Sequence, residues 1–119
     1  MDELRSVTVT PDRYVTYRYA GASGDFNPIH LDDEFARSVE LPGKILHGLW
    51  TMAQVARVHG EAAGDPLALK SLSVQFRGLG VPEKEIMITS KPRGDGEFDT
   101  EAVQDGNKLV RRGKAVLRI

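Results

Sequence analysis

The feature that most constrains the fold is a single long helical pattern between two turns. It begins at Gly48 and runs to about residue 63, before the helix-ending sequence Gly64-Asp65-Pro66. Apolar side chains recur within it at helical spacing and form a broad face, made of Leu49, Met52, Ala53, Val55 and Ala56. Because such a face has to be buried against another layer, the rest of the chain must supply that layer.

The second half of the chain is predicted to form a sheet. Residues 67–79, 83–91, 98–103 and 109–119 have strand character, with a turn at residues 92–96 and a hairpin turn at 105–107. Residues 6–9 add a short first strand. Helices followed by a run of strands predict an α+β fold with an antiparallel sheet. We therefore expect one domain over residues 1–119, in which a five-stranded antiparallel sheet wraps around one long central helix.

An earlier helix is expected after Thr10, which would be its N-cap, with Pro11 at the first helical position and an end near Gly21. It would carry three tyrosines, which we interpret as packing the helix onto the sheet: Tyr14, Tyr17 and Tyr19.

Composition excludes several classes of function. The 16 basic and 17 acidic residues give a formal charge of −1, so we expect no nucleic-acid or membrane partner. The chain has no cysteine, which excludes a thiolate nucleophile, a disulfide and a cysteine metal site. No apolar stretch approaches the roughly 20 residues that span a bilayer, and the N-terminal residues lack the pattern of a signal peptide. We expect a cytoplasmic protein.

The loop after the first helix carries two acid-base groups, Asp25 and His30, five positions apart. Gly24 loosens the backbone before Asp25, while Pro28 removes a donor and favours an extended Asn27. Gly-Asp and Asn-Pro are also ordinary turn signals, so Asp25 could simply cap a turn. On a rigid loop, however, a carboxylate and an imidazole can hold a water molecule and move its protons.

Two other groups of polar residues are interpreted as structural. Asp32, Asp33 and Glu34 stand where acids stabilise the start of a short helix, whose buried side would be Phe35, Ala36 and Val39. Too few oxygen ligands converge there for a metal, and we predict no metal and no cofactor. His59 falls late in the long helix, where a cation would interact well with the helix dipole.

A longer pattern surrounds the loop. Tyr19-Ala20-Gly21-Ala22-Ser23-Gly24-Asp25-Phe26-Asn27-Pro28-Ile29-His30 is followed by Asp32 and Ala36, then by Ile45-Leu46-His47-Gly48-Leu49 and Met52. This pattern resembles the signature of the MaoC-like, or hydratase 2, family of the hotdog superfamily. Within that family it is most similar to the catalytic subunit of actinobacterial fatty-acid synthase II 3-hydroxyacyl dehydratases.

The resemblance implies a reaction and a set of roles. Family members interconvert trans-2-enoyl and (3R)-3-hydroxyacyl thioesters by syn addition or elimination of water. By resemblance, Asp25 and His30 are the catalytic pair and the Gly48 amide binds the thioester carbonyl. Supporting roles fall to three further residues: Ser23, Asn27 and His47. Which member of the pair gives the proton to C2 stays open.

The resemblance also implies partners. Hotdog proteins typically dimerise, and this chain could pair with itself or with a related, non-catalytic subunit. The thioester carrier could be coenzyme A or an acyl carrier protein, with Lys70, Arg77 and Lys84 as candidate contacts, while Arg111 and Arg112 are interpreted as solvated strand residues. A purely scaffolding subunit would not need the Asp25–His30 pair. A hotdog thioesterase would need an acid on or near the central helix, where only Glu61 occurs, at the far end.

Overall fold

The computed structural model describes residues 6–118 of the chain. Its elements follow in the order β1 (Val7–Val9), α1 (Val15–Ser23), the 3-10 turn η1 (Pro28–His30), α2 (Asp33–Ser38), α3 (Gly48–Ala63), the 3-10 turn η2 (Pro66–Ala68), β2 (Leu69–Phe76), β3 (Ile86–Gly94), β4 (Glu97–Gln104) and β5 (Asn107–Leu117). The predicted order of one strand, helices and then four strands is confirmed, and the long helix has the predicted bounds.

The five strands form one antiparallel sheet in the order β1-β3-β4-β5-β2. Two tight hairpins join β3 to β4 and β4 to β5, with Asp95-Gly96 and Asp105-Gly106 at their tips, all four at positive φ. Such turns match the twist of the strands they join. The outer strands of the sheet are therefore β1, which is short, and β2, which is eight residues long.

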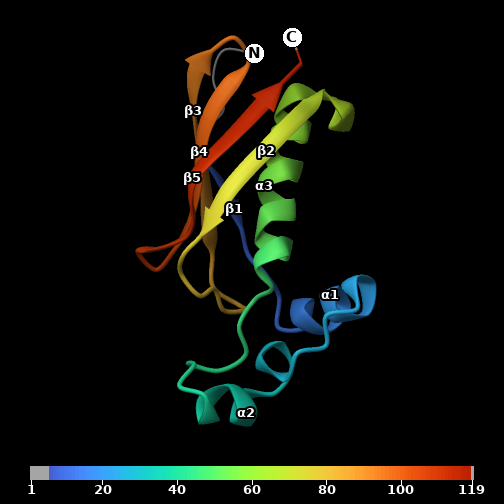
Figure 1. Cartoon of the computed structure of the whole chain (residues 1–119), viewed down its shortest axis with the longest axis vertical. Coiled ribbons are helices and arrows are strands. Elements are labelled where there is room, and N and C mark those ends of the chain that lie inside the picture. The colour runs from blue at the N-terminus through green and yellow to red at the C-terminus, as the bar shows by residue number, and fades with distance from the viewer. Residues whose placement is uncertain (1–5, 119) are drawn as a thin grey trace.

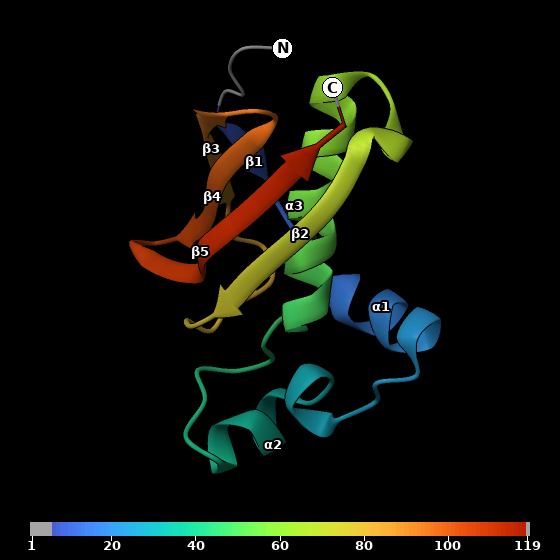
Figure 2. The same cartoon turned by 45° about the horizontal axis from the view of Figure 1, so that its top comes forward.

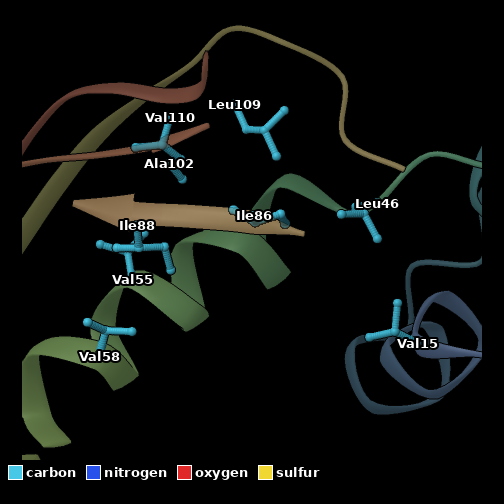
Figure 3. Packing of buried hydrophobic residues seen from close by; sticks show 9 residues of the cluster. All are labelled: Val15, Leu46, Val55, Val58, Ile86, Ile88, Ala102, Leu109 and Val110. Carbon is cyan, nitrogen blue, oxygen red and sulfur yellow. The ribbon is translucent and has the colours of Figure 1, made fainter. Parts of the chain in front are cut away.

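Helix α3 lies against one face of this curved sheet (Figure 1). Alternate residues of β4 are buried, as expected when one face of a strand meets a helix. The core joins Val55 and Val58 of α3 to inward side chains of the sheet, among them Ile86, Ile88 and Val110 (Figure 3). The apolar face predicted for this helix is therefore only partly correct: Val55 is buried, but Leu49 and Ala53 are exposed, because the helix turns Val58 and His59 towards the sheet instead. Each of these side chains contributes about 1.5–3 kcal/mol when fully removed from water. The predicted α+β architecture is confirmed.

The short helices gather at one end of the molecule. In both views, α1 and α2 lie beyond the end of α3 that begins at Gly48 (Figures 1 and 2). The segment between α2 and α3 is tied to the rest by two backbone bonds: the Ile45 amide donates to the Ile29 carbonyl, and the Leu46 amide to the Gly80 carbonyl. The start of the central helix therefore lies close to the loop that carries Asp25 and His30.

The predicted start of the first helix is wrong. Helix α1 begins at Val15 rather than after Thr10, and it continues past Gly21 to Ser23. The Pro11 carbonyl, which an early helix would use internally, instead accepts from the Glu83 amide. Asp12 then accepts from the Tyr14 amide at 2.7 Å, an Asx-type turn that holds the backbone out of the helix.

Three local predictions also need correction. The turn at residues 92–96 is shorter than expected, because β3 runs on to Gly94. In α2 only Ala36 is buried, while Phe35 and Val39 are exposed, since this helix lies away from the main sheet. The tyrosines do not pack α1 onto the sheet: Tyr14 and Tyr17 are exposed, and Tyr19 contacts His47.

His59 is structural, as predicted, but it is not a solvated cation at the end of a helix. Its side chain is fully buried, with Nδ1 donating to the Val55 carbonyl and Nε2 bonded to the Ser90 hydroxyl, both at 2.8 Å. Burial lowers the pKa of His59, with the Val55 bond acting in the opposite direction. The neutral ring thus links the central helix to β3.

Candidate active site

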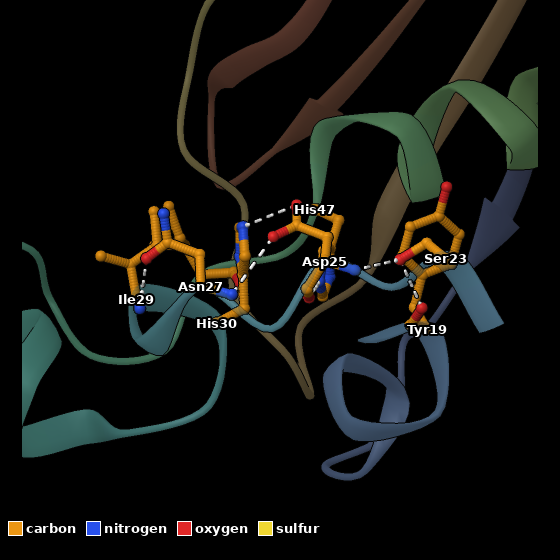
Figure 4. Close-up of polar contacts among 8 residues, drawn as sticks. Tyr19, Ser23, Asp25, Asn27, Ile29, His30 and His47 are labelled. Carbon is orange, nitrogen blue, oxygen red and sulfur yellow. Dashed lines mark hydrogen bonds and ion pairs between the residues drawn. The ribbon is translucent and has the colours of Figure 1, made fainter. Parts of the chain in front are cut away.

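The backbone around Asp25 is held by a chain of local hydrogen bonds (Figure 4). Helix α1 ends at Gly24, whose φ of 80° suits glycine. The Ser23 hydroxyl donates to the Tyr19 carbonyl at 2.7 Å and accepts from the Asp25 amide at 3.1 Å. The Asp25 carboxylate accepts from the Asn27 amide at 3.2 Å. These contacts hold a carboxylate whose side chain is still 50% exposed.

Asn27 prepares the position of His30. Its side-chain oxygen accepts from the Ile29 amide at 3.1 Å, and its carbonyl accepts from the His30 amide at 3.0 Å. Pro28 opens the resulting 3-10 turn, where its missing amide hydrogen costs nothing. The structure thus places Ser23 and Asn27 as supports of the loop, while their importance for catalysis stays a prediction.

His30 is buried, and within residues 6–118 only one of its two ring nitrogens has a hydrogen-bond partner. Nδ1 lies 2.8 Å from the Ile45 carbonyl, which can only accept, so Nδ1 carries the hydrogen. In the neutral ring Nε2 then has an available lone pair, and it lies 3.8 Å from Asp25 Oδ2. That separation is too long for a hydrogen bond, but an oxygen atom can lie about 2.8 Å from both atoms at once. The pair is therefore spaced to hold one water molecule or hydroxyl group.

His47 supports both members of this pair. Its ring stacks on His30 with centroids 3.8 Å apart and planes 20° from parallel, and its Nε2 donates to the Asp25 carbonyl at 3.1 Å. The Tyr19 ring lies against His47 at 4.8 Å. Burial lowers the pKa of His47, the bond to Asp25 opposes this, and the neighbouring His30 lowers the pKa further. A neutral His47 places no positive charge beside His30.

Gly48 is the first residue of α3, so its amide has no acceptor within the helix. A Cβ at this position would approach the Phe76 ring to 3.2 Å, so the ring packs directly over the glycine. His30 and Gly48 line one pocket of about 230 Å³, together with Ile45, Leu46, Thr51, the segment 76–80 and Leu109. His30 and the start of the helix therefore border a shared, mainly apolar space, whereas Asp25 is not among the residues that line it.

Larger hollows occur elsewhere, but they lack this combination of groups. The hollow of about 550 Å³ between β3, β4 and β5 is lined by Thr89, Lys91, Asp99, Glu101 and Arg112 among others, and contains no histidine. Much of its charge is engaged in ion pairs across the strands, such as Lys108 with Glu101 and Lys114 with Glu97, both at 3.1 Å. We therefore place the candidate active site at the smaller pocket.

Asp25, His30 and His47 offer atoms within 4.8 Å of one another, close enough to suggest a metal site. The geometry argues for acid-base chemistry instead. The two stacked rings hold their nitrogen lone pairs in nearly parallel planes, so lone pairs from both rings are not aimed at one point, and each ring already uses one nitrogen on a carbonyl. The prediction of no metal stays a prediction, now with a geometric reason.

Sequence reasoning missed several contacts of the site. The Ile45 carbonyl, which sets the tautomer of His30, and the Phe76 ring over Gly48 both come from segments distant in sequence. Tyr19 belongs to the quoted motif, yet its contact with His47 was not anticipated. A backbone carbonyl carries no sequence signal, whereas the tyrosine at a fixed spacing before Asp25 could have provided one.

Comparisons with known proteins identify the family of this chain. Residues 1–112 match the family model described as MaoC like domain. Enoyl-CoA hydratase 2, peroxisomal, from Arabidopsis thaliana is 34% identical over 110 residues, which cover 91% of this chain and 35% of that protein. Peroxisomal multifunctional enzyme type 2 from Drosophila melanogaster is 30% identical over 92% of this chain and 18% of its own length. The chain thus spans about a third or less of these relatives.

Solved structures show the same fold. A MaoC-like dehydratase from Phytophthora capsici superimposes with a TM-score of 0.90 at 28% identity, covering 99% of this chain and 43% of that one. An (R)-hydratase from A. caviae, at 20% identity, shows the fold alone, with a TM-score of 0.83 over 97% of its chain. These likenesses confirm the predicted hotdog fold, and with the family match they establish that this chain belongs to the MaoC-like family.

Proposed function

We propose that this chain is an (R)-specific hydratase/dehydratase, a hydro-lyase that interconverts trans-2-enoyl and (3R)-3-hydroxyacyl thioesters. The observation that carries the proposal is the pairing of His30 Nε2 with the Asp25 carboxylate, 3.8 Å apart, beside the first amide of α3. The named activities of the Arabidopsis and Drosophila relatives support it.

In the hydration direction, water bound between the pair attacks C3 of the enoyl thioester. His30 Nε2 accepts one proton of the water, and the Asp25 carboxylate accepts a hydrogen bond from the other. The oxygen becomes the 3-hydroxyl group, and one member of the pair returns a proton to C2 on the same face. Water is thus added across the double bond with atoms in balance, and no cofactor is required.

Negative charge develops on the thioester oxygen as water attacks. The Gly48 amide at the positive end of the α3 dipole is suited to stabilise that charge. A preorganised donor of this type contributes about 2.7–4 kcal/mol to the transition state. The glycine also allows the substrate to approach the backbone closely.

The test is hydration of crotonyl-CoA, followed by loss of the enoyl-thioester absorbance, for the wild type, Asp25→Asn and His30→Ala. Because each change removes an acid-base group, we expect kcat to fall by about 10²–10⁴-fold while the proteins stay folded. Glu61→Gln is the control, since Glu61 is exposed at the far end of α3 and pairs with Arg57. A folded wild type that hydrates neither crotonyl-CoA nor a crotonyl carrier-protein thioester would contradict the proposal.

The finer assignments remain part of the proposal. The substrate is a thioester of coenzyme A or of an acyl carrier protein, and the active form is a homodimer or a heterodimer with a related hotdog subunit. No helix within residues 6–118 is long and apolar enough to cross a membrane. A cytoplasmic location stays a prediction, and the Arabidopsis relative is named as peroxisomal.

A further inference from the structure

Three arginines gather where the end of β2 runs beside β5. Arg77 lines the active-site pocket, and its amide donates to the Leu109 carbonyl of β5 at 3.0 Å. Arg111 pairs with Gln75 across the same two strands, and Arg112 follows it at a strand irregularity with a φ of 49°. We call Arg77, Arg111 and Arg112 the arginine cluster.

The charge of the arginine cluster is not neutralised by the part of the chain that the structure describes. None of the ion pairs formed within residues 6–118 includes any of the three arginines. Glu101 lies across from Arg111 and Arg112 in the β4–β5 register, but it pairs with Lys108 at 3.1 Å. Within the described residues, no carboxylate therefore pairs with the arginine cluster, and the neighbouring Glu101 is already paired with Lys108.

Arg111 is the most unusual member. It is only partly exposed, and within the described residues its Nε atom is buried and has no hydrogen-bond partner. Burial lowers the pKa of Arg111, and the positive charges of Arg77 and Arg112 lower it further. Three like charges and an unpaired buried donor cost stability, and an anion at this position would relieve both.

Arginine is suited to one class of anion in particular. Its planar guanidinium presents a fork of donors that matches phosphate oxygens, and several such forks together bind phosphate strongly. Of the three, Arg77 lines the pocket that holds His30 and Gly48, whereas Arg112 lines the hollow of about 550 Å³ between β3, β4 and β5. Arg77 thus connects the cluster to the active-site pocket, so a molecule whose phosphate binds here can also reach into that pocket.

We propose that the arginine cluster binds the phosphate of the carrier arm of the thioester substrate. The inference rests on the proposed function, because phosphopantetheine thioesters carry a phosphate at the end of the arm remote from sulfur. Coenzyme A and an acyl carrier protein share this phosphate, and coenzyme A adds a 3′-phospho-ADP group. The assignment replaces the expectation that Arg111 and Arg112 are simply solvated.

The proposal also narrows the candidate carrier contacts, which were Lys70, Arg77 and Lys84, to Arg77. Lys84 pairs with Asp105 at 2.8 Å, and Lys70 lies at the start of β2, seven residues before Arg77. Seven residues of extended chain span about 23 Å, so Lys70 and Arg77 lie far apart. Lys70 thus provides a control with the same charge at the opposite end of the segment that contains β2.

The first test compares two substrates that differ in the phosphate. Arg77→Gln and Arg112→Asn, in which asparagine tolerates the positive φ, are assayed with crotonyl-CoA and with crotonyl-N-acetylcysteamine, which has no phosphate. For crotonyl-CoA we expect KM to rise about tenfold in each variant with kcat unchanged, because a charged hydrogen bond is lost. The KM for the short thioester and both KM values of Lys70→Gln should stay within about twofold of wild type.

Equal increases in KM for both substrates would show a structural effect and overturn the proposal. A second arm uses a crotonyl acyl carrier protein. If KM rises in the arginine variants for that substrate alone, the phosphate belongs to the carrier protein rather than to coenzyme A. If neither phosphate-bearing substrate responds, the arginine cluster does not bind the carrier.

Binding and stability separate this proposal from the enzymatic one. With 3′,5′-ADP and inorganic pyrophosphate as probes, calorimetry should detect binding to the wild type that weakens about tenfold in the arginine variants but not in Lys70→Gln. Without anion, the arginine variants should unfold at the same or a higher Tm than wild type, because repulsion is removed. If the wild type hydrates no thioester, the proposed function fails, and these binding data alone decide the phosphate site: arginine-dependent binding supports it, and its absence overturns it.

Discussion

His59 has a consequence for stability at acidic pH. Its ring is fully buried, and burial lowers its pKa, whereas in the unfolded chain a histidine has a pKa of about 6.5. As the pH falls below about 6.5, the unfolded chain therefore binds a proton that the folded form takes up less readily. The folded state loses stability in that range, by up to about 1.4 kcal/mol per pH unit for one such group.

The prediction concerns the difference between pH 7.5 and pH 5.5. Urea unfolding should give a smaller free energy at pH 5.5 for the wild type, and His59→Gln should lose less than the wild type over this interval. His47, whose pKa is also lowered by burial, still contributes to the pH dependence of the unfolding free energy in that variant. Arg57→Gln, an exposed change on the same helix, is the control. An identical pH dependence in wild type and His59→Gln would contradict the argument.

At the scale of elements, helix α3 has two functions that meet at its first residue. Its apolar side anchors the core, while its N-terminus opens into the pocket. Gly48→Ala separates these functions. Alanine favours helix over glycine by roughly 0.5–1 kcal/mol, but the new Cβ would lie 3.2 Å from Phe76 and would narrow the space in front of the amide.

For Gly48→Ala we therefore expect a Tm close to that of the wild type and a kcat/KM for crotonyl-CoA at least about tenfold lower, since close approach of the carbonyl to the amide is impaired. Thermal unfolding and steady-state kinetics measure the two quantities. Gly21→Ala is matched to it, because Gly21 is also helical and a Cβ there would contact nothing within 4 Å. Unchanged activity in Gly48→Ala would argue against the role of this amide.

At the scale of the whole molecule, the longer of the two outer strands of the sheet, β2, leaves an edge of eight residues open within the described residues. Strand β2 pairs on one side with β5, and its other edge has no strand within residues 6–118. Large apolar side chains are exposed near this edge and near the start of α3, among them Leu49 at 60%, Phe76 at 47% and Leu79 at 49%. An open edge with apolar neighbours favours association with another chain.

We expect a dimer of about twice the 13.1 kDa chain mass in light scattering at micromolar concentration. Hydrogen exchange should show β2 amides protected in the dimer and exposed on dilution, because a partner strand or helix covers that edge. Amides of β4, which is paired on both sides within the chain, act as the internal reference. A chain that stays monomeric at 100 µM and is fully active would contradict the dimer and the requirement for a partner.

The sequence by itself determined the central helix, the order of the elements and the identity of the paired acid-base groups. These are local matters: turn residues at Gly64-Asp65-Pro66, apolar spacing along residues 48–63, and the Gly24–Pro28 loop each act through nearby backbone geometry. Where a distant group competed, the prediction failed. The Pro11 carbonyl bonds to Glu83 instead of starting a helix, and β3 gains pairing that extends it to Gly94.

Only the tertiary structure decided how the site is built. The tautomer of His30 depends on the Ile45 carbonyl, its ring stacks on His47, and the Phe76 ring packs against Gly48, all brought together from separate segments. Burial, which lowers the pKa values of His59 and Arg111, is likewise a property of packed layers rather than of sequence spacing. Sequence specifies the groups, and long-range packing sets their distances, their exposure to water and hence their chemistry.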